Sequence, residues 1–420
     1  MPGNRKLIVS LALGAAVVAA IPVLAQRSPT GGPVARYDMR AGTVSGMGAM
    51  GAGGGMGMGM SMMMGGGGNR LQHELYLRLG SSRAVAPGAP KADHFMPPSA
   101  RLGKSVALVT PKLEPVAEEW KGEKPKGRLL LFWGCGEHAP KGQPIVIDFA
   151  KMAAGQTPPG LWSTTIIRDW GPTLTNSKTF GRWPAEDGKY VKADSALPGE
   201  HKIVGNYSPD IAFTLTKDFM AALRSKQANQ PSGAQLVSWN AVPDATGYLA
   251  TLMGGKMGPR GYMGDMVMWS SSATRQFGGG LDDWLTPAQV ANLIKDRTVM
   301  TPQTTSCMVP AEVRAAAPDF KVGTLIAYGP MESFSYPPAP ANPKAAWVLE
   351  WSARVRHRST TSWMDMPGME GMGDMGMDDE GDSRSSSSSS QQQKSKPKCK
   401  PRGGLGGLGG MLGGIVSPGC

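Results

Sequence analysis

Between residues 104 and 216 the chain carries only short apolar runs, each rich in Val, Ile, Leu or aromatic side chains and bounded by turn residues. Runs of this kind, with Gly and Pro between them, are typical of the strands of an antiparallel β-sandwich. We therefore expect a first β-rich domain over residues 102–228, ending in a short helix at 217–226. The predicted strands are 105–110, 128–133, 144–149, 162–170, 202–207 and 211–216.

A second group of strand signals follows a polar linker at residues 227–233. The sequence Gln235-Leu-Val-Ser-Trp239, with Pro243 in a turn and Gly247-Tyr248 opening the next strand, resembles the second and third strands of fibronectin type III domains. This resemblance, placed within residues 234–358, implies an immunoglobulin-like sandwich. Modules of that kind bind or space more often than they catalyse, although a fold alone does not decide function.

The rest of this second domain, residues 229–360, contains a helix signal and a final strand. Thr286 and Pro287 suit the cap and the first position of a helix near 286–295. Residues 347–356 alternate apolar and polar side chains, which predicts a half-buried strand. The helix is therefore expected as an insertion into the sandwich.

The predicted fold is mainly β, with two antiparallel β-sandwich-like domains, the second with a helical insertion, flanked by disordered Met/Gly-rich and Ser/Gly-rich tails. Residues 26–101 form a Met/Gly/Pro-rich arm of low complexity, in which 71–79 predict a short strand, and residues 361–420 form the tail. Such segments bury too little apolar surface to offset the ordering cost of the backbone, about 1 to 2 kcal/mol per residue.

Residues 1–25 have the pattern of a secretory signal peptide. Arg5 and Lys6 precede an apolar run over 7–24, and Ala25 offers a small residue for cleavage. A retained membrane anchor is the alternative, but Pro22 interrupts the roughly 20 apolar residues that a spanning helix needs. We expect no transmembrane anchor and a periplasmic or extracellular location. Residues 129–137 and 146–155 resemble an uncharacterised family of secreted Gram-negative proteins, which implies the same compartment.

The four cysteines lie far apart, and an exported chain meets an oxidising environment. Cys135 and Cys307 fall in the predicted domains and are the candidate disulfide, which would link the two domains and restrict the unfolded chain by about 5 kcal/mol in the entropy model. The alternative is an enzyme in which His138 activates the Cys135 thiol. We expect no enzyme, because no oriented base or oxyanion site accompanies this pair.

The tail contains a methionine pattern that suits a soft metal. It resembles the methionine-rich segments of periplasmic copper-resistance proteins, in which thioethers hold copper, and thioethers suit Cu(I) or Ag(I). A compositionally biased disordered tail is the alternative. The candidate ligands are Met364, Met366, Met369, Met372, Met375, Met377 and, in a mixed site, His357. His357 could also be a buried structural residue of the last strand.

Two further methionine groups flank glycines, at residues 56–62 and 253–268. The first could bind metal or act as a flexible spacer. The second lies around a predicted turn between strands, where adaptable packing under the loop is the favoured interpretation.

The formal net charge of +12 either serves solubility or favours acidic partners, and for an exported chain such partners are anionic cell-surface polysaccharide or lipid rather than nucleic acid. Basic residues cluster at 354–358 and 394–402. The sequence therefore predicts a non-enzymatic binding or surface protein that could capture Cu(I) or Ag(I) through its methionine-rich arms. The alternative is a structural or adhesive surface protein with no metal role.

Overall fold

The computed structural model describes residues 32–49, 71–85, 88–111, 127–156, 166–169, 171–186, 189–257, 263–342 and 345–366. Within these ranges the protein is mainly β, which confirms the predicted fold class: the strands form three sheets and the helices are short. The predicted signal peptide and nearly all of the predicted tail lie outside the described residues. No helix in the described part of the chain is long and apolar enough to cross a membrane.

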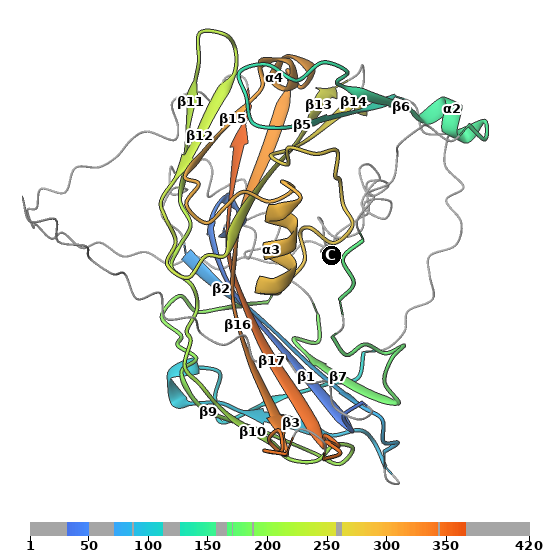
Figure 1. The fold of residues 1–420 in the computed structure, drawn as a ribbon, viewed down its shortest axis with the longest axis vertical. Helices are drawn as coiled ribbons and strands as arrows, with labels where there is room; N and C mark the ends of the chain where they lie inside the picture. Colours follow the sequence, from blue (N-terminus) through green and yellow to red (C-terminus); the bar gives the residue numbers. More distant parts are fainter. Residues whose placement is uncertain are drawn as a thin grey trace, which may run out of the picture.

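The largest sheet has ten strands, and β16 and β17 run along much of the long axis of the molecule (Figure 1). Its neighbours are antiparallel except for two parallel pairs, β1 with β17 and β5 with β14. The strands in order are β6 (Ile145–Asp148), β5 (Arg128–Trp133), β14 (Met263–Ser270), β13 (Gly247–Met257), β16 (Phe320–Tyr336), β17 (Trp351–Asp365), β1 (Ala35–Gly46), β2 (Leu71–Ser81) and β7 (Thr179–Trp183), and β8 (Tyr190–Val191) also pairs with β2.

We call β1, β2 and β7 the lower half of this sheet and β13, β14, β5 and β6 its upper half. The strands β16 and β17 belong to both halves. The inner face is the one covered by the two smaller sheets, and the outer face is the opposite one.

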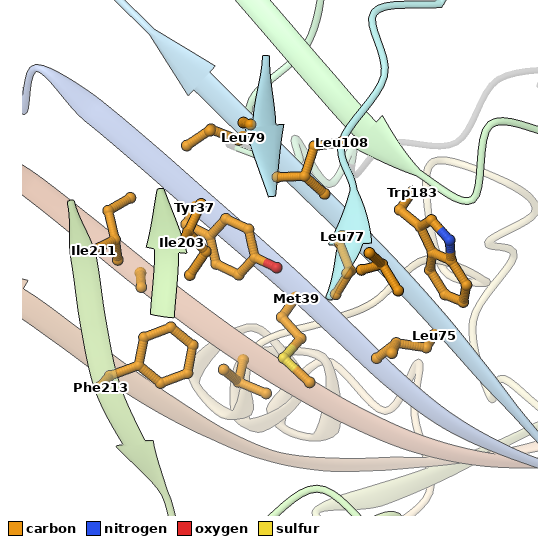
Figure 2. Packing of buried hydrophobic residues seen from close by; sticks show 14 of the residues in the cluster. Tyr37, Met39, Leu75, Leu77, Leu79, Leu108, Trp183, Ile203, Ile211 and Phe213 are labelled. Carbon is orange, nitrogen blue, oxygen red and sulfur yellow. The ribbon is translucent and has the colours of Figure 1, made fainter. Parts of the chain in front are cut away.

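The small four-stranded sheet covers the inner face of the lower half. Its order is β10 (Ile211–Leu215), β9 (Gly199–Gly205), β3 (Ala92–Phe95) and β4 (Val106–Ala107), and a short 3-10 helix spans Pro98–Ala100. Figure 2 shows Tyr37 and Met39 of β1 and Leu75 and Leu77 of β2 facing the side chains of this sheet. This packing forms the first sandwich.

A buried chain of hydrogen bonds crosses this core. The Tyr37 hydroxyl lies 2.6 Å from His94 Nδ1, His94 Nε2 lies 3.0 Å from His201 Nδ1, and His201 Nε2 lies 2.8 Å from the Leu197 carbonyl oxygen. Because a carbonyl can only accept, His201 donates to it, His94 donates to His201 and Tyr37 donates to His94. These directions hold for neutral imidazoles, the form that burial favours by lowering the pKa of both histidines, and they use every ring nitrogen.

A three-stranded sheet covers the inner face of the upper half and forms the second sandwich. It consists of β11 (Ser225–Asn229), β12 (Gln235–Trp239) and β15 (Ser306–Val309), followed by the short helix α4 (Ala311–Ala316). Trp239 and Val237 pack there against Tyr248, Leu252 and Trp269 of the large sheet. The predicted strand that ends at Trp239 is therefore present.

The helix α3 (Pro287–Lys295) lies on the outer face, between the two halves (Figure 1). Its Val290 and Leu293 pack on Leu249, Ile326 and Tyr328 of the sheet. The Thr286 hydroxyl accepts a hydrogen bond from the Gln289 amide and forms the capping box that stabilises the first turn. This confirms the predicted helix. The small helix α2 (Phe149–Ala153) follows β6 and is capped by Asp148.

The helix predicted at 217–226 is wrong. The backbone there hydrogen-bonds to side chains of the large sheet instead of to itself: Thr43 donates to the Met220 carbonyl, and the Leu223 amide donates to Ser359. The segment then continues into β11, which forms a hairpin with β12 across the expected linker. The strand predicted at 162–170 is also absent over residues 166–169, which are irregular.

The predicted arm and domain boundaries do not match the sheets. Residues 26–101 contribute β1 and β2 to the large sheet, each between two neighbouring strands, so the arm prediction is wrong for these strands, although the strand expected at 71–79 is confirmed. The large sheet also takes β5, β6, β7 and β8 from the predicted first domain and β13, β14, β16 and β17 from the second. The two sandwiches therefore share one sheet.

Candidate anion-binding site

The outer face of the lower half carries a row of arginines. In β1 the apolar side chains Tyr37 and Met39 point inward, so the alternation of the strand directs Arg36, Asp38 and Arg40 outward. Strand pairing places further residues opposite them on the same face. The seven arginines of this arginine face are Arg36, Arg40, Arg78, Arg182, Arg354, Arg356 and Arg358.

At the centre of the arginine face, Asp38 holds two guanidinium groups. Arg356 Nη2 lies 2.8 and 2.7 Å from the two carboxylate oxygens of Asp38, and Arg40 Nε lies 2.8 Å from one of them. Asp38 is fully buried, and both arginines are at most 5% exposed. Since charges removed from water are tolerated only when paired, this triad fixes the register of β1 against β17.

Asp169 closes the network from a segment that passes over the sheet. Its carboxylate pairs with Arg40 and lies 3.1 Å from Arg356 Nη2. Burial would raise the pKa of Asp169, but the charges of Arg40 and Arg356 outweigh it and bring this pKa down to about 2. Asp169 is therefore ionised at any pH at which the protein is expected to work.

A second cluster lies beside the first, where Arg358 meets Glu74. The Arg358 Nε and Nη2 atoms lie 3.0 and 2.9 Å from one carboxylate oxygen of Glu74, and Nη1 donates to the Asp282 carbonyl at 2.8 Å. The guanidinium also lies over the Trp284 ring, 4.1 Å from its centroid. This cation–π contact further fixes Arg358.

The remaining arginines leave the face with excess positive charge. Seven guanidinium groups share this face with the carboxylates of Asp38, Glu74 and Asp169, and Asp282 and Asp283 lie close by. Arg78 lies 3.6 Å from Asp169, and Arg354 has no hydrogen bond or ion pair to any described residue. Burial chiefly lowers the pKa of both; the like charges of Arg40 and Arg356, respectively, lower it further, while the carboxylates of Asp38 and Asp169 raise it. Both groups are in surroundings that favour an added anion.

A cleft of about 640 Å³ adjoins this face at Arg36. Its walls come from the start of β1, the end of β2 and the loop before β7, and most of the side chains that line them are of polar types. Gly80 allows this loop to approach, since a Cβ there would collide with Ser177 and Pro172. The lining side chains are Pro33, Val34, Arg36, Ser81, Ser82, Thr175, Asn176, Ser177 and Lys178, with Gly32 and Gly80.

Arg36 links the cleft to the loop. Its Nη2 donates to both the backbone carbonyl and the side-chain oxygen of Asn176, each at 2.8 Å. Asn176 in turn accepts from the Thr173 amide and donates to the Gly171 carbonyl. The cation is thus held at a fixed position in a wall of hydroxyl and amide groups.

The structure joins Cys135 and Cys307 in a disulfide, with Cα atoms 5.3 Å apart. Cys135 lies in the loop after β5 and Cys307 in β15, so the bond ties the large sheet to the three-stranded sheet. His138 pairs with Glu312 at 3.1 Å. The alternative of a Cys135 nucleophile activated by His138 is therefore wrong, because this sulfur is not a free thiol.

The predicted mixed metal site is not assembled. His357 is 2% exposed, and burial lowers the pKa of its imidazole. Seven residues of β17 separate it from Met364, which at about 3.3 Å per residue is roughly 23 Å, and the odd spacing puts the two side chains on opposite faces. His357 thus does not share a metal with Met364 or Met366. Residues that are near in sequence lie far apart along an extended strand, and this is why the mixed site is not formed.

Met364 and Met366 are half-buried, while Met369, Met372, Met375 and Met377 lie outside the described residues. Their binding of copper stays a prediction. Among the residues that the structure describes, no three His, Cys, Asp or Glu side chains converge as a metal site.

Sequence reasoning found part of the arginine face, as the basic run 354–358, but not its partners. The acidic partners Asp38, Glu74 and Asp169 lie far from that run in the chain, and only the strand order brings them together. The family resemblances noted in the sequence stay predictions. No protein-family model matches this chain, and no curated protein sequence matches it either.

Proposed function

We propose that this chain is an exported, non-enzymatic binding protein that captures an acidic polysaccharide at the arginine face and its adjoining cleft. The observation that carries the proposal is Arg354, a half-buried guanidinium without a hydrogen bond or ion pair to any described residue. A guanidinium is charged at neutral pH and presents a planar fork that matches carboxylate, sulfate or phosphate groups.

The side chains that line the cleft support a polysaccharide rather than a lipid surface. Hydroxyl and amide side chains such as Ser82, Thr175 and Asn176 line it beside the cations Arg36 and Lys178. Sugar hydroxyls need such donors and acceptors at fixed positions, whereas an anionic bilayer needs basic side chains that project from a convex surface. The overall charge of +12 would assist the approach of an acidic polymer.

The test compares binding of the full chain to an acidic polysaccharide, polygalacturonate, with binding to neutral dextran at low and high salt. We expect retention on polygalacturonate alone. In the double variant Arg78→Gln, Arg354→Gln the affinity should fall about tenfold or more, since hydrogen bonds to charged groups contribute about 1.5 to 3 kcal/mol. The dependence on salt should also weaken.

A matched control keeps the charge change away from the site. Lys226, exposed on β11, carries no ion pair to a described residue, so Lys226→Gln should leave affinity nearly unchanged. Equal losses in control and site variants would mean that only net charge matters, and the proposed site would be wrong. Preferential binding to anionic phospholipid vesicles would assign the face to a lipid surface instead and would also refute the proposal.

The capture of Cu(I) or Ag(I) by the methionine-rich tail is a separate prediction from the sequence. It does not depend on the arginine face, because neither Met364 nor Met366 belongs to it. Replacing Met369, Met372, Met375 and Met377 by Leu and counting bound Cu(I) under anaerobic conditions tests that prediction by itself.

A further inference from the structure

Strand pairing gathers methionines on the outer face of the upper half. Met253 of β13 lies directly opposite Met268 of β14, and Met266 is two residues from Met268 on the same face. Directly opposite side chains in an antiparallel pair have Cβ atoms about 4.5 to 5.5 Å apart, and diagonal neighbours about 7 to 8 Å. Three thioethers therefore start from adjacent positions on two strands.

These side chains also contact one common cluster. Met266 is 5% exposed and packs with Leu129, Leu131 and Ile147, while the half-buried Met253 and Met268 pack against the same residues. The Met266 position faces Gly255 on β13, which contributes no side chain. Its thioether can therefore turn toward Met253 and Met268 without a cross-strand side chain between them.

Thioether sulfur is an uncharged, polarisable ligand that suits Cu(I) and Ag(I) and serves hard cations poorly. The nearest acidic side chain on these strands, Asp265, is engaged by Arg128, with Nε 3.0 Å from its carboxylate. A methionine side chain has three rotatable bonds, so sulfurs from adjacent positions can converge on one ion. The partial exposure of Met253 and Met268 leaves a route for the ion to enter.

We propose that Met253, Met266 and Met268 form a three-sulfur site for Cu(I) or Ag(I) on the folded sheet. The proposal goes beyond capture of an acidic polymer and is independent of it, since it involves the opposite half of the sheet. Met364 lies in the same row as Met253, with Val322 between them, and so about 10 Å away at the usual strand spacing. The predicted methionine-rich tail thus begins beside this site.

The experiment follows the methyl resonances of the full chain, labelled with [methyl-13C]methionine, during anaerobic titration with Ag(I). Each resonance is assigned from a single Met→Leu variant. We expect the methyls of Met253, Met266 and Met268 to shift together with the first equivalent of Ag(I). The triple variant M253L/M266L/M268L should lose one bound equivalent, because Leu keeps the packing and removes the sulfur.

Three further variants test whether the effect belongs to these three methionines. The triple variant M39L/M220L/M331L, with methionines from elsewhere in the fold, should keep the full stoichiometry. The tail variant with Leu at 369, 372, 375 and 377 should keep the shift of the sheet methyls. Since the sheet triple could unfold, M268L alone, at a half-exposed position, should weaken the first binding step. The site would be refuted if the first equivalent of Ag(I) shifted only the methyls of other methionines. It would also be refuted if M253L/M266L/M268L folded and still bound the full number of Ag(I) equivalents.

Discussion

The two halves of the large sheet use the same backbone arrangement but carry opposite chemistry on their outer faces. The lower half sets seven arginines against a smaller number of carboxylates, whereas the upper half sets thioethers and Leu or Ile side chains there. Both rows are continuous because β16 and β17 pass through both halves. One sheet can thus display a hard, charged surface and a soft, uncharged one without a domain boundary between them.

The halves also differ in what holds them together. In the upper half a covalent bond ties the smaller sheet to the large one, whereas in the lower half the Tyr37–His94–His201 hydrogen-bond chain joins the two sheets and buried ion pairs lie on the outer face of the large sheet. Covalent and electrostatic restraints respond differently to reductant and pH. Reductant should therefore destabilise mainly the upper half, and acid mainly the lower half.

The largest effect is expected from removing the disulfide. Cys135 and Cys307 are 172 residues apart, and closing a loop of that length stabilises the fold by about 5 kcal/mol in the chain-entropy model. C135A/C307A should lower the free energy of unfolding in denaturant titration by about that amount. The wild type in reductant should match the variant, and the variant should not respond to reductant. Equal stability of both proteins would show that the bond constrains nothing in the upper half.

A slightly smaller effect is expected from Asp38→Ala in the lower half. The substitution leaves Arg40 and Arg356 buried with one carboxylate fewer, and breaking a buried pair in this way costs about 3 to 5 kcal/mol. Asp194→Ala is the matched control, since its pair with Arg101 is more than half exposed and such pairs contribute about 0 to 1 kcal/mol. A similar small loss in both variants, measured by chemical denaturation, would contradict the distinction between the halves.

Acid should produce the third effect, strongest around His94 and His201 in the lower half; burial also lowers the pKa of His73 on β2 and of His357 on β17, which adds to the loss. Burial chiefly lowers the pKa of His94 and of His201, so at falling pH the unfolded chain takes up protons that the fold excludes. Their contribution is present above pH 6.5 and is lost as the pH falls below it, by at most about 2 kcal/mol for each histidine at pH 5. The pKa of about 2 for Asp169 places its own loss at lower pH.

Hydrogen exchange at pH 7.5 and pH 5 measures this loss and locates it. Amides of β3, β9 and β10 should lose protection in acid before those of β12 and β15. Uniform protection across both sandwiches at the two pH values would count against a special role for the histidine chain.

Local sequence signals predicted the local elements well. The apolar run of β5 and the N-cap Thr286 with the first residue Pro287 of α3 have the predicted positions because their determinants lie within a few residues of one another. The strand β1 was missed because its inward side chains alternate with Arg36, Asp38 and Arg40, which in a sequence are typical of solvent-exposed segments. Their burial depends on partners that no local pattern reveals.

The candidate site shows the same limit. The basic run at 354–358 was visible, but whether these arginines are solvated or paired depends on strands far away in the chain. Arg356 is 3% exposed and bound to Asp38, whereas Arg354, two residues earlier, has no such partner. Only the pairing of β1 with β17 separates the structural arginine from the one available to a ligand.

The pairing of β1 with β17 has a consequence for how the chain acquires its structure. Asp38 and Arg356 meet across 318 positions, so the middle of the ten-stranded sheet stays open until β17 has been synthesised. Pairings between such remote segments form slowly, and β1 and β2 must meanwhile keep a long edge exposed to unwanted association. A protein assembled in this order gains from any delay that keeps its early segments apart until the last strand arrives.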